Sequence, residues 1–344
     1  MQRFNQKLVS HLRSCGDFRL IRWGRSQALL PLFLLFALLK TVALRVGGKI
    51  DRVYLGDGLM SPLGFFFKKV LGLKVAVSIH GRDIAFAFPG YLTVVPWALQ
   101  RLDRVICVSS QLKGECRRFG VGEEILTAIP NGVDVEDFAW REQVSPREFL
   151  GLSLDDRTVL ITVGRLVTKK GVDRFIRDIL PKIVAAEPRV LCLVVGGGPL
   201  LAEIDALIAE KGLKDHVLLA GDIPMDDPRL KALYNAADIF VMPNVLIGGD
   251  IEGFGIVALE GGAAGLPVVA SRLQGIQEAI VPGKNGILLP WDDPDAFVRT
   301  ILDLIRNPGE RKKLGESARR CVADNYSWSS IARRYWQEFM SLQE

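Results

Sequence analysis

Two cations follow an apolar run in the second half of the chain, at a spacing suited to a diphosphate. The run "TVLITVGRL" ends just after Arg165, and Lys170 lies five positions beyond that arginine. Arginine offers a planar fork of N–H donors and lysine a mobile point charge, so together they can neutralise a diphosphate. Because cations after a strand are also common as surface charges, this pair alone leaves both interpretations open.

A run of three glycines follows the next apolar segment. In "VVGGGPL", Gly196, Gly197 and Gly198 separate an expected strand from an expected helix. Glycine lets the backbone approach a ligand closely, and a helix N-terminus favours anions, but a tight turn would need the same residues. The run is not G-x-G-x-x-G, and no acidic residue closes a second strand at the distance that a dinucleotide fold requires. A nicotinamide cofactor is therefore disfavoured.

The stretch "GGDIEGFGIVALEGGAAGLPVVAS" combines two carboxylates with the start of a helix. Glu252 lies in its glycine-rich loop, and Glu260 lies eight positions on, in the helix that the loop opens. The backbone N–H groups of Phe254, Gly255 and Ile256 fall at the start of this helix, where a phosphate binds well. Glu260 can accept both hydroxyls of a ribose, and Glu252 can accept hydroxyls of a sugar. A single glutamate is commonly a solvated or capping group, but the whole arrangement favours a binding site.

Short apolar runs that alternate with helical segments must position these residues. Segments long enough for crossover helices separate the runs, which implies parallel strands in α/β doubly wound sheets. Such sheets bind ligands outside the carboxyl ends of their strands, so we expect two Rossmann-like domains facing an interdomain cleft. The expected strands are 52–55, 74–81, 104–110, 125–132, 158–166, 190–199, 216–223, 238–244, 267–271 and 286–290.

The length of 344 residues suffices for two domains with a core each. The charged, irregular segment 134–157 is interpreted as the connection between them. We place the first domain at 1–145, the second at 146–326 and a terminal helix at 327–344. The five cysteines form no close-spaced pair, which indicates thiols in a reducing compartment.

The first hundred residues are strongly basic, with 14 Lys or Arg against 4 Asp or Glu. This imbalance suggests an anionic membrane surface or a phosphorylated substrate as partner, or else a solvated basic face. The apolar run Ala28–Leu39 has 12 residues, short of the ~20 that a spanning helix needs. With Arg19, Arg22 and Arg25 before it and "FFFKK" further on, it favours contact with anionic lipid headgroups over a plainly buried helix.

The opening "MQRFNQK" is polar and is not typical of a signal peptide. We therefore expect a cytoplasmic protein, with peripheral attachment to the inner face of the membrane as a further expectation. No nucleic-acid partner is expected.

Several motifs resemble those of the family 4 glycosyltransferases, which are retaining enzymes of the two-domain GT-B fold. In the second half these are "GRLVTKKG", "VGGGP", "MPN" and "EGFGIVALE" followed by "GLPVVAS". In the first half, "SIHGRD", "VICVSS" and "IPNGVD" are similar to the N-terminal domain of that family. The resemblance implies an acceptor-side first domain, a second domain that binds a nucleotide sugar, and a terminal helix that crosses back to the first domain.

The resemblance also implies roles for the residues that surround the donor. Arg165 and Lys170 would hold the donor diphosphate and stabilise charge on the leaving group. Glu252 would contact the donor sugar, helped by the backbone amides of Phe254 and Gly255.

Five further residues complete the implied site. Glu260 would hold the nucleotide ribose, the backbone around Ile223 would shape the base pocket, and Gly197 and Gly198 would bring backbone close to the donor. His80 of the first domain would reach the sugar near the reacting centre. A lone histidine after a strand is otherwise commonly a structural residue.

The expected donor is a UDP-sugar or a GDP-sugar, and the expected acceptor is a saccharide, preferably lipid-linked or part of the cell envelope. The resemblance implies that no metal or other cofactor is needed, since members of the family generally work without one. The implied mechanism is front-face displacement with retention, in which the leaving diphosphate helps to deprotonate the acceptor hydroxyl. Two alternatives remain: a non-catalytic or impaired paralogue that binds a nucleotide sugar, and another GT-B enzyme such as a sugar-nucleotide epimerase or a phosphorylase.

Two features depart from the family's pattern. Gly261 and Gly262 stand inside the helix after Glu260, at a cost of about 1 kcal/mol each relative to alanine, and we expect them to allow close packing against the nucleotide. The chain also opens with a helix and then the expected strand "FRLIRW", without the family's first strand and glycine-rich loop. We expect Met1 to be an internal methionine of a longer reading frame, or the chain to be a truncated form with impaired activity.

Overall fold

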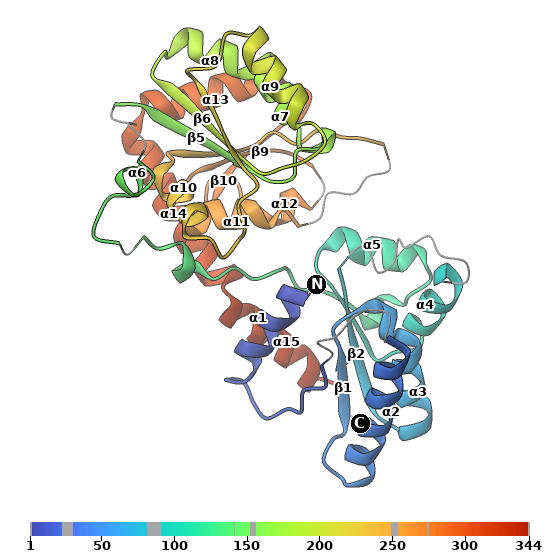
Figure 1. Cartoon of the computed structure of the whole chain (residues 1–344). Helices are drawn as coiled ribbons and strands as arrows, with labels where there is room; N and C mark the ends of the chain where they lie inside the picture. Colours follow the sequence, from blue (N-terminus) through green and yellow to red (C-terminus); the bar gives the residue numbers. More distant parts are fainter. Residues whose placement is uncertain are drawn as a thin grey trace. The chain divides into compact units, whose positions relative to one another are not determined.

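Figure 1 shows the computed structural model, which describes residues 2–22, 30–80, 91–140, 142–151, 156–248, 254–273 and 275–342. The chain divides into two compact units. The first combines Met1–Asn131 with Trp328–Glu344, and the second is Gly132–Ser327.

The sequence places the first boundary after residue 145, whereas the structure places it after Asn131. Val133, Val135 and Phe138 are buried in the core of the second unit, and the Val133 N–H donates to the Tyr326 carbonyl at 2.8 Å. Most residues of the segment 134–157 are charged or polar, so the sequence indicates a linker. The few apolar residues at its start nevertheless belong to the core of the second unit.

In the first unit, the described strands form one parallel sheet in the order β1-β2-β3-β4. Successive side chains alternate between its faces: Val105 and Cys107 join one apolar cluster, and Ile106 joins the cluster on the other face. The expected parallel strands are confirmed. Their bounds are β1 (Arg52–Leu55), β2 (Lys74–Ile79), β3 (Arg104–Cys107) and β4 (Leu126–Ala128).

Helices cover both faces of this sheet. The cluster with Val105 takes side chains from α2 (Leu30–Val46), α3 (Ser61–Leu71), α4 (Tyr91–Leu99) and α5 (Ser110–Arg118). The cluster with Ile106 takes side chains from α1 (Gln2–Leu12) and α15 (Trp328–Met340). Phe4 of α1 packs edge-on against Trp328 of α15, with ring centroids 5.2 Å apart. Residues 18–22 form no strand, contrary to the prediction from "FRLIRW". Short turns of helix are η2 (Gly58–Met60) and η3 (Glu123–Ile125).

The described strands of the second unit form a larger parallel sheet in the order β10-β9-β8-β5-β6-β7. From β5 the chain proceeds to β6 and β7 on one side and then returns, with β8, to the other side of β5. The strand order therefore reverses between β5 and β8. The bounds are β5 (Thr158–Val163), β6 (Val190–Val195), β7 (Val217–Gly221), β8 (Ile239–Met242), β9 (Val268–Ser271) and β10 (Gly286–Leu289).

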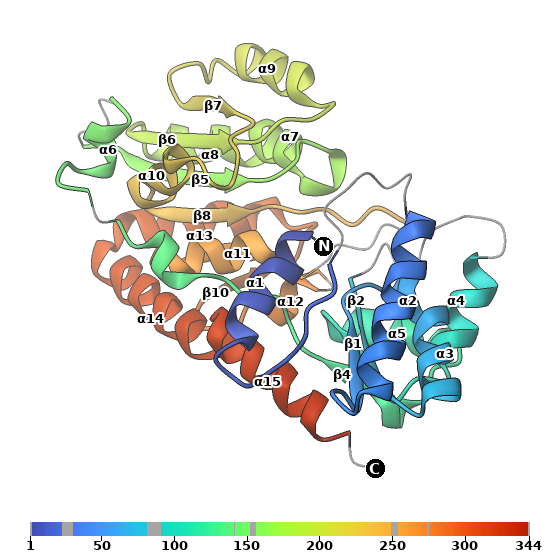
Figure 2. The ribbon, with the colours of Figure 1, turned by 60° about the horizontal axis from the view of Figure 1, so that its bottom comes forward.

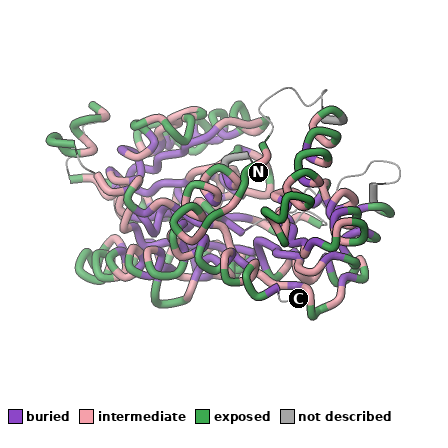
Figure 3. The backbone as a smooth tube through the Cα atoms, turned by 90° about the horizontal axis from the view of Figure 1, so that it is seen from below, coloured by how far each residue is buried: buried purple, intermediate pink, exposed green. Residues whose placement is uncertain are grey.

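Two helical layers cover the second sheet, and buried residues run along its strands (Figure 3). One face carries α10 (Pro228–Ala236), α11 (Ile256–Ala263), α12 (Ile276–Ala279), α14 (Pro308–Tyr326) and the short turn η4 (Val135–Phe138). The other carries α7 (Val172–Arg174), the wide turn η6 (Phe175–Ile179), α8 (Leu180–Ala186), α9 (Leu201–Glu210) and α13 (Pro294–Arg306). Two short elements remain, α6 (Pro146–Phe149) and η5 (Thr168–Lys170).

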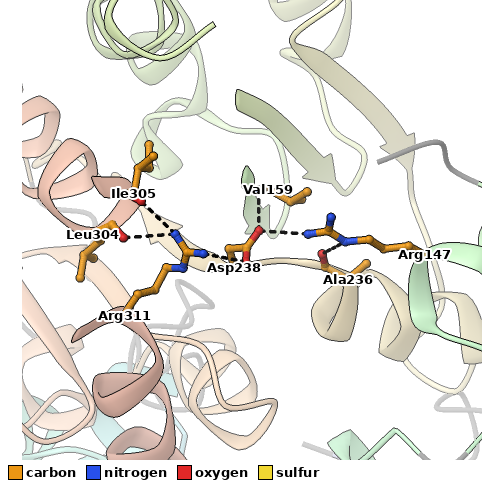
Figure 4. Close-up of polar contacts among 7 residues, drawn as sticks. All are labelled: Arg147, Val159, Ala236, Asp238, Leu304, Ile305 and Arg311. Carbon is orange, nitrogen blue, oxygen red and sulfur yellow. Dashed lines mark hydrogen bonds and ion pairs between the residues drawn. The ribbon is translucent and has the colours of Figure 1, made fainter. Parts of the chain in front are cut away.

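Asp238 fixes the junction between β5 and β8 (Figure 4). It directly precedes β8, and its Oδ2 accepts the Val159 N–H of β5 at 2.8 Å. The same carboxylate pairs with Arg147 at 3.1 Å and with Arg311 at 3.3 Å. Arg311 also donates to the carbonyl of Leu304. Segments distant in the sequence are thereby held at the point where the strand order reverses.

Helix α2 has 17 residues, LPLFLLFALLKTVALRV, of which only two are charged. Within the described part of the chain, no helix is both long and apolar enough to cross a membrane.

Candidate active site

The reversal of strand order defines where a ligand should bind to the second unit. In an open α/β sheet, the connections that leave the two strands at this point pass to helices on opposite faces of the sheet, and ligands bind outside the carboxyl ends of these strands. Here these are the loop after β5, which carries Arg165 and Lys170, and the loop after β8, which leads to α11.

The loops after β5 and β8 are packed against each other. The Val245 N–H donates to the Lys169 carbonyl at 3.0 Å. Gly171 has φ +65, and a Cβ at this position would collide with the carbonyl oxygen of Pro243. Only glycine tolerates both the left-handed backbone and the close approach. Lys170, the residue before Gly171, is thereby fixed beside the loop after β8.

A small cavity, about the size of a water molecule, lies at this junction; most of its lining is apolar, and Lys170, Thr162 and Asn244 are its polar members. Asn244 is 1% exposed, and Lys170 is half-buried. Arg165 lies near in sequence and is exposed. The structure thus places two cations on the loop that follows the carboxyl end of β5, at the edge of the sheet where an anionic ligand would need them.

Asn244 and Thr162 were not among the predicted site residues. Asn244 belongs to the motif "MPN" directly after β8, and a polar residue in that position is the signal that could have found it. Thr162 stands inside the apolar run of β5 and carries no such signal.

The glycine run after β6 packs against the loop after β5. A Cβ on Gly196 would collide with the Gly164 carbonyl, and one on Gly198 with the Leu166 carbonyl. The Leu166 N–H donates to the Gly197 carbonyl at 2.9 Å. This packing accounts for the need for glycine at 196 and 198, whether or not a ligand approaches them. Gly197 and Gly198 are themselves partly exposed beside the loop that carries Arg165.

Ile223 follows β7 at the same edge of the sheet. Its side chain is partly buried and packs against the core cluster of the second unit. The neighbouring Gly221 carbonyl accepts the Gly196 N–H at 2.8 Å, which joins this loop to the glycine run.

The start of α11 lies near the end of β8. Gly255 caps the helix with φ +68, and a Cβ at this position would lie 3.5 Å from the Met242 side chain at the end of β8. Phe254 is buried against Tyr326, with ring centroids 5.9 Å apart, while Ile256 is exposed. The predicted sugar contact Glu252 lies outside the described residues.

Glu260 is buried in α11, at 2% exposure. The Tyr234 hydroxyl of α10 donates to its Oε2 at 2.8 Å. Tyr234 itself packs edge-on against Phe138 and stacks on Phe240. Burial, and then the charge of Glu260, raises the pKa of Tyr234 well above its usual value. The hydroxyl therefore stays protonated and remains a donor to the carboxylate.

Gly261 and Gly262 pack against protein, contrary to the expectation that they face the nucleotide. A Cβ on Gly261 would approach the Phe240 ring of β8 to 2.8 Å, and one on Gly262 would approach Val322 of α14 to 2.9 Å. Both glycines are buried. They allow α11 to lie close to the sheet and to α14, which explains their place inside a helix.

His80 follows β2 and belongs to the first unit, whereas the other described site residues belong to the second. Its ring packs edge-on against Phe4, with centroids 4.5 Å apart. Burial lowers the pKa of His80 to about 4, so the ring is neutral at pH 7.

Comparison with known proteins gives the class to which this fold belongs. The fold matches that of HepE from Anabaena, solved with UDP, at a TM-score of 0.72 and 19% identity over 92% of this chain and 84% of that one. It also matches sucrose-phosphate synthase from Thermosynechococcus elongatus, at a TM-score of 0.72 and 23% identity over 98% and 92% of the two chains. The molecule has the GT-B fold.

Two family models match the chain. "Glycosyl transferases group 1" matches residues 148–321, and "Glycosyltransferase Family 4" matches residues 11–137. The chain therefore belongs to the family 4 glycosyltransferases, as its motifs predicted.

Relatives in the family include lipid-modifying enzymes. The GDP-mannose-dependent alpha-(1-6)-phosphatidylinositol monomannoside mannosyltransferase of Mycolicibacterium smegmatis is 31% identical over 292 residues, covering 83% of this chain and 75% of that one. A GDP-mannose-dependent mannosyltransferase of Corynebacterium glutamicum that acts on the monoacylated lipid is 28% identical over 327 residues, covering 92% and 83%.

Proposed function

We propose that this protein transfers a sugar from a nucleoside diphosphate sugar to a hydroxyl group of a lipid-linked or cell-envelope saccharide, with retention of the anomeric configuration. The observation that carries the proposal is the position of Lys170. It lies on the loop after the carboxyl end of β5, held beside the loop after β8, with Arg165 on the same loop.

In the proposed reaction, the bond between the sugar and the diphosphate breaks, and negative charge develops on the leaving diphosphate. Lys170 and Arg165 neutralise this charge. The acceptor oxygen forms its bond to the anomeric carbon on the face that the diphosphate vacates, which gives retention, and the proton of the acceptor hydroxyl passes to the leaving diphosphate. The protein supplies position and electrostatic stabilisation, and the two cations take the role that a metal has in other transferases.

The donor is proposed to carry GDP or UDP. GDP is supported by the names of the two mannosyltransferase relatives, and UDP by the ligand of the HepE structure. The lipid-linked acceptor is supported by the phosphatidylinositol acceptor named for the first relative. Glu260 is proposed to bind the ribose and Glu252 the sugar.

Titration calorimetry of the whole chain with GDP and UDP tests donor binding. Arg165→Ala and Lys170→Ala should each weaken the preferred nucleotide by about 10- to 100-fold, because each removes a charge-assisted hydrogen bond. Lys214→Ala, an exposed lysine after α9, is the matched control and should leave the affinity unchanged. Equal affinities in all variants would contradict the proposed diphosphate site.

Proton NMR of the first product formed tests the reaction class. The anomeric configuration of the donor should be retained, and no sugar phosphate should form. A product of inverted configuration would overturn the proposed mechanism, and sugar phosphate would identify a phosphorylase.

A further inference from the structure

Helix α2 is apolar on the side that faces solvent as well as on the side that packs against the sheet. Its exposed positions are 32, 35, 36, 39, 40, 43 and 46, the spacing of one helix face. Leu32, Leu35, Phe36 and Leu39 are exposed by 60%, 53%, 48% and 61%, and only Lys40 interrupts the apolar surface. The buried Ala37 marks the opposite side. A surface helix in a water-facing position normally carries polar residues on this side.

The neighbouring helices extend this apolar surface. Helix α3 contacts both α2 and α4, and the three lie in one layer on the same face of the first sheet (Figure 2). Helix α3 exposes Phe66 and Val70, and α4 exposes Val94 and Trp97. We call these four side chains, together with the exposed residues of α2, the α2–α4 face. Exposed apolar side chains gathered on neighbouring helices mark an interaction site.

The helices of the α2–α4 face and the residues directly after them carry cations and no carboxylate, and one of these cations, Lys68, pairs with Asp103 before β3 at 3.0 Å. The segments 30–50, 61–74 and 91–101 contain no Asp or Glu. Their cations are Lys40, Arg45, Lys49, Lys68, Lys69, Lys74 and Arg101. Lys40 lies 5.5 Å from the centroid of the Phe36 ring, and the Arg101 guanidinium lies 4.6 Å from that of Trp97. Cations thus stand directly beside the exposed aromatic rings, so the partner must offer both apolar surface and negative charge.

We propose that the α2–α4 face docks on the surface of an anionic phospholipid membrane. The apolar side chains enter the boundary between headgroups and acyl chains, and the lysines and arginines meet the lipid phosphates. A second copy of the same face would bring like charges together, whereas anionic lipid supplies the opposite charge. The docking does not depend on the proposed transferase function, because binding to lipid requires neither donor nor acceptor.

Flotation of the whole protein with vesicles tests the proposal. Vesicles of phosphatidylcholine mixed with phosphatidylglycerol should bind the protein, vesicles of phosphatidylcholine alone should bind it about tenfold or more weakly, and added salt should weaken binding. The variant Leu32→Ser/Leu35→Ser/Leu39→Ser should lose binding by more than about tenfold, because each leucine contributes buried apolar area. Its control, Phe149→Ser/Leu201→Ser, changes exposed apolar residues of the second unit and should bind as the wild type does.

Charge reversal provides an independent variant if the serine variant fails to fold. Lys40→Glu/Lys69→Glu should weaken binding by about tenfold or more, since each cation near the surface contributes to the attraction. Lys214→Glu/Lys312→Glu, at exposed positions of the second unit, should not change it.

Two results would overturn the proposal. One is equal binding of the wild type and the Lys40→Glu/Lys69→Glu variant to anionic vesicles. The other is a wild type that does not bind vesicles and is a dimer by light scattering, while the leucine-to-serine variant is a monomer. The α2–α4 face would then join two copies of the chain.

Discussion

At the scale of single residues, the buried contact between Tyr234 and Glu260 ties α10 to α11 beneath the candidate site. A buried carboxylate is stable only when hydrogen-bond donors compensate for the loss of water, and the Tyr234 hydroxyl is such a donor at 2.8 Å. In the proposed function Glu260 binds the ribose, and this hydroxyl would hold its carboxylate in place for that contact.

Removing this hydroxyl should affect both stability and binding. We expect Tyr234→Phe to lower the free energy of unfolding by about 2 kcal/mol, because the carboxylate loses a donor in a buried place. Nucleotide affinity should fall several-fold. Urea unfolding and calorimetry measure the two effects. The matched control is Tyr335→Phe, which removes a buried hydroxyl beside Ser78 in the first unit and should leave nucleotide affinity unchanged. An unaltered free energy of unfolding in Tyr234→Phe would contradict a stabilising role.

His80 gives the first unit a dependence on pH. Its pKa is lowered from 6.5 to about 4 by burial, so the unfolded chain binds a proton between these values that the folded protein does not. The free energy of unfolding should therefore be at its full value above about pH 6.5. It should fall by at most about 3 kcal/mol as the pH is lowered to about 4, because protonation then favours the unfolded chain. Urea unfolding at a series of pH values, in wild type and His80→Gln, measures the difference. Parallel pH profiles of the two proteins would refute the assignment.

The residues proposed for the site were chosen from the sequence, but the contacts that they make in the structure could not be predicted from it. Arg165 and Lys170 are recognisable because they follow an apolar strand. The bond from Tyr234 to Glu260 joins residues 26 positions apart on two helices, and it depends on how those helices pack. The same holds for Gly261, whose neighbour Phe240 lies on a strand 21 positions earlier, so the expectation of a nucleotide contact was wrong.

At the scale of elements, the packing of the loop after β5 on the loop after β8 depends on the close approach of Gly171 to the Pro243 carbonyl oxygen. Gly171→Ala places a Cβ against the Pro243 carbonyl and strains a left-handed backbone, so the loop with Lys170 must move. We expect a loss of more than about 2 kcal/mol in the free energy of unfolding, with nucleotide affinity at least about tenfold weaker.

The control for Gly171 is Gly212, which has nearly the same backbone angle, with φ +67, but no atom within 4 Å of an added Cβ. Gly212→Ala should therefore cost only the left-handed strain of about 1 kcal/mol and should leave nucleotide affinity intact. If the two variants behave alike, the close approach to Pro243 has no role in the site.

Asp238, at the start of β8, joins several elements (Figure 4). Its carboxylate accepts a hydrogen bond from β5 and forms ion pairs with Arg147 and Arg311. Asp238→Asn retains an acceptor for Val159 but loses both ion pairs, and both arginine side chains are half-buried. We expect about 2 kcal/mol of destabilisation in urea. Glu310→Gln, which breaks the exposed pair with Lys313, is the control and should have no measurable effect. A similar small effect in both variants would show that the Asp238 network does not stabilise the junction.

The strands could be predicted well because parallel strands buried on both faces are continuous apolar runs. The run 52–55 coincides with β1, and the run at 158–166 contains β5. The segment 172–186 is helical throughout, with the π-helical turn η6 between α7 and α8. Pro181 is the cause of this turn, because it has no N–H to donate to the preceding turn. The failed strand "FRLIRW" has apolar residues without a described neighbour strand to pair with.

At the scale of the whole molecule, the described residues proposed to bind the nucleotide belong to the second unit, and the α2–α4 face and His80 belong to the first. Because the two proposed binding sites lie in different units, donor binding and lipid binding can be tested separately. It also implies that neither the diphosphate nor the ribose needs the first unit for binding, because Lys170, Arg165 and Glu260 are all held by elements of the second.

Metal removal tests whether the two cations suffice for the leaving group. We expect transfer activity to be unchanged after dialysis against EDTA, because Arg165 and Lys170 neutralise the diphosphate in the proposed mechanism. The measurement is the initial rate with and without added Mg²⁺ or Mn²⁺. A rate that falls on chelation and returns with the metal would show that the cations alone do not carry the charge.

Hydrogen exchange can separate the contributions of the two units to donor binding. At a concentration of 100 times its Kd, a nucleoside diphosphate stabilises the protein that binds it by about 2.7 kcal/mol, which corresponds to about 100-fold slower exchange of amides that open with the bound unit. We expect this protection in β5, β6 and β8 and little change in β2 and β3, because the diphosphate and ribose contacts lie in the second unit. The intact nucleotide sugar should add protection at the end of β2, where His80 lies, if that residue reaches the sugar. Equal protection of both sheets by the diphosphate alone would show that the first unit also binds the nucleotide.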